Sequence, residues 1–286
     1  MQGKSQDPTK RLAMVSLAAA TLLAGPALAD WSNTTPVVGV GGGCPIESRD
    51  GNALYTASGR GGTLDIWVYE RNGRVGAFEG PILLGDPVSL PDAADFCPTP
   101  LPGYWLLFVS DRPGGCGGAD MYIARYRPSP ANSWGEARNL GCGPDGPNTA
   151  GRELSPSLVT NEEGAYLYYS TDTGGSQDIY RSAMAPDGSF GPGELVAGLN
   201  TGFADQQPNV SGDGLEIVFS SNRDGAGQDV FTATRSSIDA PWSNVRNLTA
   251  ELSLPTVDGN ETRASMSWDR KRLYYGSGGT IFVSER

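Results

Sequence analysis

The feature that most constrains this chain of 286 residues is a unit that recurs five times along it. Each copy has a short apolar segment ending in Ser, followed by Asp, an aliphatic residue and an aromatic residue; the fifth copy is degenerate. The signatures start at intervals of 51 to 58 residues, at Asp65, Asp120, Asp178, Asp229 and Thr280. Units of this length bury their apolar faces only against their neighbours, so the repeat predicts a stacked or circular array.

The segments within each unit read as strands. They are short, rich in aromatic and β-branched residues, bounded by Gly, Asp and Asn, and none sustains a helical stripe. We expect strands at 53–58, 104–110, 165–170, 215–220 and 272–277. Each Asp-aliphatic-aromatic signature begins the next strand, and a fourth strand is headed by Phe78, Trp134, Phe190 or Trp242. The unit is therefore predicted to be a four-stranded meander.

The two ends of the chain complement each other. The fifth unit stops at Arg286 after its third strand, while Trp31-Ser32-Asn33 matches Trp242-Ser243-Asn244. We therefore predict an all-β, five-bladed β-propeller, in which residues 31–38 supply the last strand and remove exposed sheet edges. The predicted blades span 44–80, 95–140, 153–198, 205–250, and 261–286 together with 31–38.

The first 29 residues have the pattern of a signal peptide. Basic residues precede an uncharged run from Leu12 to Ala29, which ends in Ala27-Leu28-Ala29, a signal-peptidase pattern. A membrane anchor would need about 20 strongly apolar residues, whereas this run is mostly Ala with Gly25 and Pro26 near its end. We expect residues 1–29 to be removed and 30–286 to form one domain without a membrane span, periplasmic or secreted.

Composition excludes several classes of function. Lys and Arg number 21 against 32 Asp and Glu, giving a net charge of −11, which argues against nucleic acid as a partner. The chain has no His, which removes histidine-dependent hydrolase triads and every histidine metal site.

The repeats resemble a known class. Asp205–Pro208, Ser211–Gly214, Ile217–Arg223 and Asp229–Phe231 are similar to the WD-type β-propeller repeats of TolB-like proteins. The resemblance covers nearly all of residues 44–285 and implies the propeller fold. TolB-like repeats occur in exported bacterial proteins that bind partners and in appendages of peptidases, so the resemblance does not single out one activity.

Four carboxylates should meet at the mouth of the central channel where the innermost strands begin, which we take as the expected site. They stand three residues before Pro98, Pro156, Pro208 and Ala264, whereas the first blade has Gly42. Crowded carboxylates raise one another's pKa or recruit a cation, so they are catalytic candidates. Recurrence in four blades favours a structural role instead. The four are Asp95, Glu153, Asp205 and Glu261.

Loops between the second and third strands supply further candidates at this mouth. They are rich in Gly, with Asp, Asn or Arg at their heads, and Asp172 stands out as a residue where other blades place Arg. Blade-to-blade salt bridges are an equally good interpretation. The ligand-contact candidates are Arg60, Asp111, Arg112, Asp172, Arg223 and Asp224. The acidic rim leaves calcium open as a cofactor, although the chain has no Asp-x-Asp-x-Asp-Gly loop; we assign no metal ligand.

Four cysteines in an exported chain predict two disulfides. Cys44 and Cys97 occupy equivalent positions before Pro in adjacent blades, and Cys116 lies in a loop with Cys142 in the following linker. We expect Cys44 to pair with Cys97 and Cys116 with Cys142. A zinc site built from all four thiolates competes with this pairing, but no Cys-x-x-Cys spacing supports it.

Four of the tryptophans have repeat-defined positions, where large rings fill the space between sheets. They are Trp31, Trp67, Trp134 and Trp242. Trp105 and Trp268 are less periodic; we expect them to be buried as well, with exposure or sugar stacking as the lesser alternative.

The preferred functional hypothesis is an exported, monomeric, non-catalytic propeller that binds a protein, peptide or glycan through the loop face around its channel. The alternative is a carbohydrate-active enzyme resembling glycoside hydrolases, because five-bladed propellers of furanosidase type use acidic residues in a central funnel and here the rim carboxylates would be the acid and base or nucleophile. A purely structural module of the envelope is a third interpretation.

Overall fold

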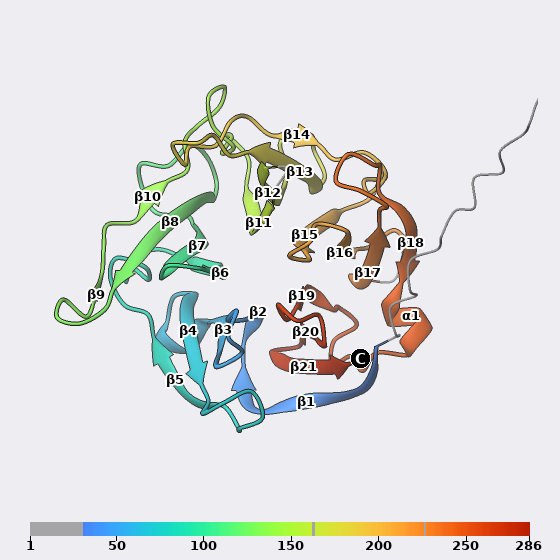
Figure 1. Cartoon of the computed structure of the whole chain (residues 1–286), viewed down its shortest axis with the longest axis horizontal. Coiled ribbons are helices and arrows are strands. Elements are labelled where there is room, and N and C mark those ends of the chain that lie inside the picture. The colour runs from blue at the N-terminus through green and yellow to red at the C-terminus, as the bar shows by residue number, and fades with distance from the viewer. Residues whose placement is uncertain (1–30, 162–163, 226) are drawn as a thin grey trace, which may run out of the picture. The chain divides into compact units, whose positions relative to one another are not determined.

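Five antiparallel sheets surround a central axis in the computed structural model, which describes residues 31–161, 164–225 and 227–286 (Figure 1). The expected signal peptide, residues 1–29, lies outside the described residues. Each sheet runs outward from an innermost strand, so the five-bladed propeller predicted from the repeats is confirmed.

The blades follow the sequence repeats closely. Blade 1 consists of β2 (Gly43–Glu47), β3 (Ala53–Ser58), β4 (Asp65–Glu70) and β5 (Glu79–Leu83). Blade 2 consists of β6 (Asp95–Leu101), β7 (Trp105–Ser110), β8 (Asp120–Arg127), β9 (Ser133–Trp134) and β10 (Arg138–Asn139). Blade 3 consists of β11 (Glu153–Asn161), β12 (Gly164–Thr171), β13 (Asp178–Ala183) and β14 (Glu194–Leu195). Blade 4 consists of β15 (Asp205–Val210), β16 (Glu216–Ser221), β17 (Asp229–Thr234) and β18 (Ser243–Asn247). Blade 5 consists of β19 (Thr262–Met266), β20 (Arg272–Ser277), β21 (Thr280–Glu285) and β1 (Ser32–Gly41).

The hydrophobic core is divided into layers between neighbouring sheets. One layer packs Ile217 and Phe219 of blade 4 against Tyr168 of blade 3, and Trp242 closes its outer side. Four further layers separate the other pairs of blades. Each blade thus buries both faces against its neighbours, which explains why the middle strands read as continuous apolar runs.

The ring closes as the matching ends predict. β1 pairs antiparallel with β21, and Ser32 stands opposite Glu285 while Gly41 stands opposite Thr280 (Figure 1). Trp31 is buried between blades 4 and 5. The guanidinium carbon of Arg286 lies 3.9 Å from the centroid of the Trp31 ring, and the same guanidinium pairs with Glu216 of blade 4 at 2.7 Å. Trp31 and β1 are therefore fastened to the C-terminal strand, and Arg286 to the neighbouring blade.

Two helical turns were not expected from the repeat. A short helix, α1 (Leu248–Leu252), is capped by the Asn247 side chain, and a 3-10 turn, η1 (Gly59–Gly61), follows β3. Among the described residues, no helix has the length and apolar character needed to cross a membrane.

Replacing Trp31 with Ala should lower the free energy of unfolding by about 3–5 kcal/mol, because it empties a buried indole site at the seam of the ring. The measurement is urea unfolding monitored by circular dichroism. Val38→Ala is the matched control on the same strand, since Val38 is 85% exposed and its loss should change stability by no more than about 0.5 kcal/mol. Equal, small effects of the two substitutions would show that β1 does not seal the ring.

Candidate functional site

A left-handed residue interrupts each innermost strand. These residues lie at the bulge where pairing with the second strand shifts register. Positive φ is uncommon for residues other than Gly, yet all five positions carry side chains. They are Cys44 (φ 49°), Cys97 (φ 47°), Ser155 (φ 57°), Gln207 (φ 57°) and Arg263 (φ 46°), and we call them the channel waist.

The side chains of the channel waist link different blades. A disulfide joins Cys44 of blade 1 to Cys97 of blade 2, and the Ser155 hydroxyl of blade 3 donates to the Cys97 sulfur at 3.3 Å. The backbone N–H of Arg263 donates to Gln207 Oε1 at 2.9 Å, which joins blades 5 and 4. The waist therefore lies between two mouths: the N-mouth, where the innermost strands begin, and the C-mouth, where they end.

A second polar layer lies two residues further along four of the innermost strands, toward the C-mouth, whereas blade 1 has Ile46 at this position. Thr99 donates to the Pro156 carbonyl at 2.6 Å, and Ser265 donates to the Pro45 carbonyl at 2.7 Å. Ser157 and Asn209 accept backbone N–H groups from the next blade at 3.1 and 2.9 Å. Buried polar groups in the channel are thus used to tie neighbouring blades together.

The four predicted rim carboxylates lie at the N-mouth, as expected, but they are buried. Asp95, Glu153 and Asp205 are 0% exposed and Glu261 is 1% exposed. Asp95 pairs with Arg112 at 2.7 Å and accepts the backbone N–H of Leu90. These carboxylates organise the loops around them.

In blades 2 and 4 an arginine pairs with the rim carboxylate. Arg223 pairs with Asp205, which also accepts the N–H and the hydroxyl of Thr201 at 2.6 and 2.7 Å. Both Arg112 and Arg223 bind the carboxylate of their own blade and carbonyls of the linker before it. The ion pairs expected between blades are therefore formed within a blade.

Blades 3 and 5 use glutamate and hydroxyl groups instead. Glu153 accepts hydrogen bonds from Thr149 and Thr171, and no arginine pairs with it among the described residues. Burial raises the pKa of Glu153, and the hydroxyl donors lower it less. Burial likewise raises the pKa of Glu261. These two carboxyls bind protons more tightly than an ordinary glutamate.

The prediction that Asp172 replaces an arginine is wrong. Asp172 Oδ1 accepts the N–H of Arg152 at 2.7 Å, as Asp111 Oδ1 accepts that of Ala94 and Asn222 Oδ1 that of Ala204. Asp172 is thus the equivalent of Asp111, and Thr173 stands where other blades have arginine.

The remaining N-mouth candidates have local partners. Arg60 belongs to the blade that has Gly42 in place of the rim carboxylate, and it donates to the Tyr69 hydroxyl at 2.7 Å and lies over the Trp67 ring. Asp224 accepts from the Asn247 side chain at 2.7 Å. The described residues contain no group of three or more Cys, Asp or Glu placed to hold a metal ion.

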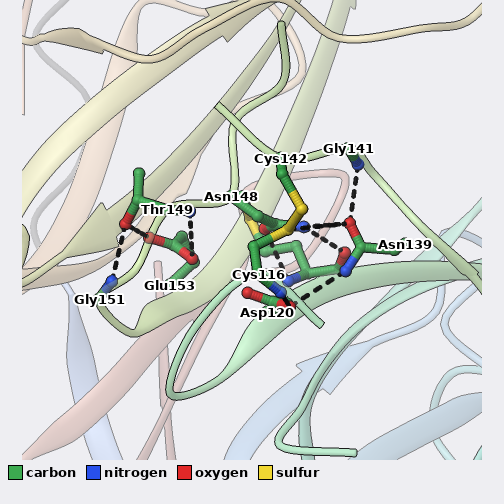
Figure 2. Close-up of a disulfide and its surroundings, with 10 residues drawn as sticks. Cys116, Asp120, Asn139, Gly141, Cys142, Asn148, Thr149, Gly151 and Glu153 are labelled. Carbon is green, nitrogen blue, oxygen red and sulfur yellow. Dashed lines mark hydrogen bonds between the residues drawn. A yellow bond between two sulfur atoms is a disulfide. The ribbon is translucent and has the colours of Figure 1, made fainter. Parts of the chain in front are cut away.

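Both predicted disulfides are confirmed. Figure 2 shows that Cys116–Cys142 closes the loop of blade 2 over Asp120, Asn139 and Asn148. Asn148 is fully buried; it bonds the backbone of Met121 in both directions and donates to Asn139, which in turn donates to Asp120 at 3.1 Å. The Asp of the repeat signature therefore has a structural role in blade 2.

A large hollow lies at the opposite mouth from the expected site. A cavity of about 830 Å³ opens at the C-mouth and extends between blades 2 and 3. Thr99, Ser157 and Asn209 of the second polar layer line its channel side, and Trp105 of blade 2 and Phe190 of blade 3 line the part between the blades.

The five blades contribute dissimilar residues to the rim of this cavity. Five positions after each left-handed residue, near the ends of the innermost strands, stand Arg49, Pro102, Thr160, Gly212 and Trp268, all of which line the cavity. The backbone of the waist repeats from blade to blade, whereas the side chains at this rim do not. A rim of dissimilar residues can hold a ligand in one orientation, whereas a rim of five identical residues would bind it equally well in five.

Two tryptophans line the cavity together with arginines. Trp268 is 47% exposed, so the expectation that it is buried is wrong; Trp105 is half-buried. The Arg49 guanidinium lies 3.9 Å from the Trp268 ring centroid, and a Cβ at Gly212 would approach the same ring to 3.0 Å, so a side chain at this position would press against the indole. Arg138 lies 5.9 Å from the Trp105 ring, and neither Arg49 nor Arg138 pairs with a carboxylate of the described chain.

Two carboxylates line the cavity among the described residues. Glu47 is held by Arg71 and by Arg272, at 2.9 Å from the latter, and accepts the Tyr274 hydroxyl. Asp187 is exposed, and hydrogen bonds from Ser189 lower its pKa. The lowered pKa of Asp187 does not suit a proton donor near neutral pH, which contrasts with the raised pKa values of Glu153 and Glu261 at the N-mouth.

Sequence reasoning missed the C-mouth cavity and the waist arginine. The irregular positions of Trp105 and Trp268 were the available signal, because residues that depart from a repeat mark where blades differ. Arg263 had a similar signal: it is the charged residue among five equivalent positions otherwise held by Cys, Ser and Gln.

Comparison with known proteins identifies the fold but no sequence family. No protein-family model matches the sequence, and no curated protein matches it. The α-L-arabinofuranosidase from Lactobacillus brevis is 13% identical over 86% of this chain and 91% of that chain, with a TM-score of 0.59. An α-L-arabinofuranosidase from Podospora anserina, solved with cellotriose, is 13% identical over 90% and 96%, also with a TM-score of 0.59. TolB from Acinetobacter baumannii is 14% identical over 89% of this chain, with a TM-score of 0.46; the chain spans 55% of that protein's length.

Replacing Arg223 with Met should lower the free energy of unfolding by about 3–5 kcal/mol, because it leaves the Asp205 carboxylate buried without its cation. Chemical unfolding at neutral pH measures the loss. Arg181→Met is the control, since its pair with Glu194 is 3.8 Å long and exposed, and removing it should cost less than about 1 kcal/mol. A loss for Arg223→Met no larger than that of the control would contradict a structural role.

The raised pKa of Glu261 predicts a pH-dependent stability. The folded chain holds the proton of this carboxyl more tightly than the unfolded chain does, whose value is near 4.5, so stability falls as pH rises from there through the folded pKa. Glu261→Gln should reduce the difference in unfolding free energy between about pH 4.5 and about pH 7 relative to the unmodified protein. Exposed Glu285→Gln is the control, and an unchanged difference in Glu261→Gln would refute the assignment.

Proposed function

We propose that this chain is a carbohydrate-recognising propeller that binds its glycan in the C-mouth cavity. The observation that carries the proposal is the combination of a cavity of about 830 Å³ with Trp105, Trp268, Arg49 and Arg138 in its wall. This volume lies within the range of small-molecule sites, roughly 300–1,000 Å³. A flat apolar sugar face stacks on indole, and arginine donors bond ring and hydroxyl oxygens.

The interior of the cavity suits a polar, uncharged ligand. Thr99, Ser157 and Asn209 line its channel side, while Leu101, Ile123 and Phe190 line the part between the blades. Hydroxyl-rich ligands with apolar faces match such a mixed wall better than an extended peptide, which would need an unpaired strand edge for its backbone.

The similar structures also favour carbohydrate over a protein or peptide ligand. The neighbours named above with TM-scores of 0.59 are arabinofuranosidases, and an endo-arabinase from Bacteroides thetaiotaomicron VPI-5482 has a TM-score of 0.57 over 90% of this chain and 97% of that chain. At 13–14% identity these likenesses identify a fold, and they support the ligand class as a proposal.

A glycoside hydrolase is the second candidate function. It is favoured by those same neighbours and by Glu153 and Glu261, whose raised pKa values suit a general acid. Both glutamates are at most 1% exposed, so a substrate would reach them only after the N-mouth loops move. Binding at the C-mouth requires no such rearrangement, which is why we place it first.

We propose that the protein is exported and monomeric.

Trp268→Ala should weaken binding to the recognised oligosaccharide about tenfold or more, because it removes a stacking surface worth at least about 1.4 kcal/mol. Isothermal titration calorimetry against a panel of arabinan, arabinoxylan and cello-oligosaccharides measures the affinity. Phe203→Ala is the matched control, since Phe203 is 49% exposed but lies at the N-mouth and should leave the affinity unchanged.

The same panel separates the two candidate functions. Binding that is lost equally in Trp268→Ala and Phe203→Ala, or no binding to any member, would contradict the C-mouth proposal. Release of shorter sugars by the unmodified protein, lost in a folded Asp205→Asn and Glu261→Gln double variant, would establish hydrolysis at the N-mouth instead.

A further inference from the structure

Arg263 crosses the channel at the waist. Its backbone belongs to blade 5, yet its Nη2 donates to Thr99 Oγ1 of blade 2 at 3.0 Å. Blade 1 separates these two blades around the ring, so the guanidinium lies across the interior of the channel. The whole residue is 0% exposed and is the largest fully buried side chain of the described chain.

This guanidinium is incompletely paired. Its Nε and Nη1 are buried without a hydrogen-bond partner in the described chain, and it forms no ion pair with a carboxylate there. Arg235, which is also buried, shows the usual solution: the Gly214 and Ile238 carbonyls and the Tyr168 hydroxyl accept its hydrogen bonds. A buried cation with two idle donors is costly unless an anion compensates it.

Burial alone lowers the pKa of Arg263 to about 9, so the group remains charged at neutral pH. Among the described residues no carboxylate forms an ion pair with this guanidinium, although the full chain has a net charge of −11. An anion from solution would supply the compensating charge.

We propose that the channel waist binds a small monovalent anion, chloride in solution, against Nε and Nη1 of Arg263. The neighbours of the guanidinium restrict the size of the anion. Ser155 and the Cys44–Cys97 disulfide fill other positions of the waist, and Thr99 and Gln207 hold the side chain and the backbone of Arg263. The side-chain NH₂ group of Gln207, another residue of the waist, is a hydrogen-bond donor of the kind that an anion accepts from. The anion site shares Thr99 with the wall of the C-mouth cavity, but its donors, Nε and Nη1 of Arg263, are not among the residues of the glycan proposal.

Bromide provides the positional test. Crystals grown with bromide in place of chloride should show an anomalous peak within hydrogen-bond distance of Arg263 Nε or Nη1, and Arg263→Met crystals should lack it. Density for water alone at these atoms, with no halide peak there, would overturn the proposal.

Unfolding in chloride and in gluconate, at equal ionic strength, tests whether the ion stabilises the fold. Chloride should divide the unfolding equilibrium constant of the unmodified protein by a factor of 1 + [Cl⁻]/Kd. Gluconate, which is much larger than chloride, should not have this effect. Arg263→Met, which replaces an uncompensated charge with an apolar chain of similar length, should fold and lose this dependence. Arg60→Met removes an exposed cation and should keep it. Equal chloride dependence in the unmodified protein and in Arg263→Met would refute the site.

Discussion

The left-handed residue in each innermost strand is the constraint on which the rest of this propeller depends. Such a backbone costs of order 1 kcal/mol or more in a residue with a Cβ, so contacts across blades must hold it. A disulfide, a hydroxyl–sulfur contact and two hydrogen bonds of Arg263 do so here. Because the backbone geometry repeats while the side chains differ, the waist fixes the ring and divides the channel into two chemically distinct mouths.

The two mouths differ in how they use the repeat. At the N-mouth, an acidic residue recurs in four blades, and each copy is buried under its own loop. At the C-mouth, the equivalent rim positions are occupied by Arg49, Pro102, Thr160, Gly212 and Trp268. A structural role produces the same residue type in each blade, because every blade packs in the same way. Residues that differ between blades are not required for this packing, and at the C-mouth they surround the cavity.

Much of the fold was predictable because each blade carries a local signature. Apolar runs bounded by turn residues located the second strands, and Trp31-Ser32-Asn33 revealed the seam because it copies Trp242-Ser243-Asn244; both Asn residues adopt the same left-handed φ, 52° and 53°. The equivalence of Cys44 and Cys97 predicted their pairing. The site was not predictable in the same way. Non-Gly residues with positive φ have no sequence mark, and Asp172 was misaligned because Thr173 replaces the loop arginine, which removed the landmark.

Charge compensation of the rim carboxylate differs between blades. Blades 2 and 4 pair Asp with Arg, whereas blades 3 and 5 keep the acid as Glu beside Thr hydroxyl groups and have no arginine paired with it among the described residues. Blade 1 lacks the acid and keeps Arg60, whose exposure lets water solvate the charge. Arg263 alone among these arginines has neither a carboxylate nor access to solvent. Arg235 is also buried without a carboxylate, but carbonyl and hydroxyl oxygens accept its hydrogen bonds, whereas Nε and Nη1 of Arg263 have no acceptor in the described chain; these are the two donors to which we assign the proposed anion.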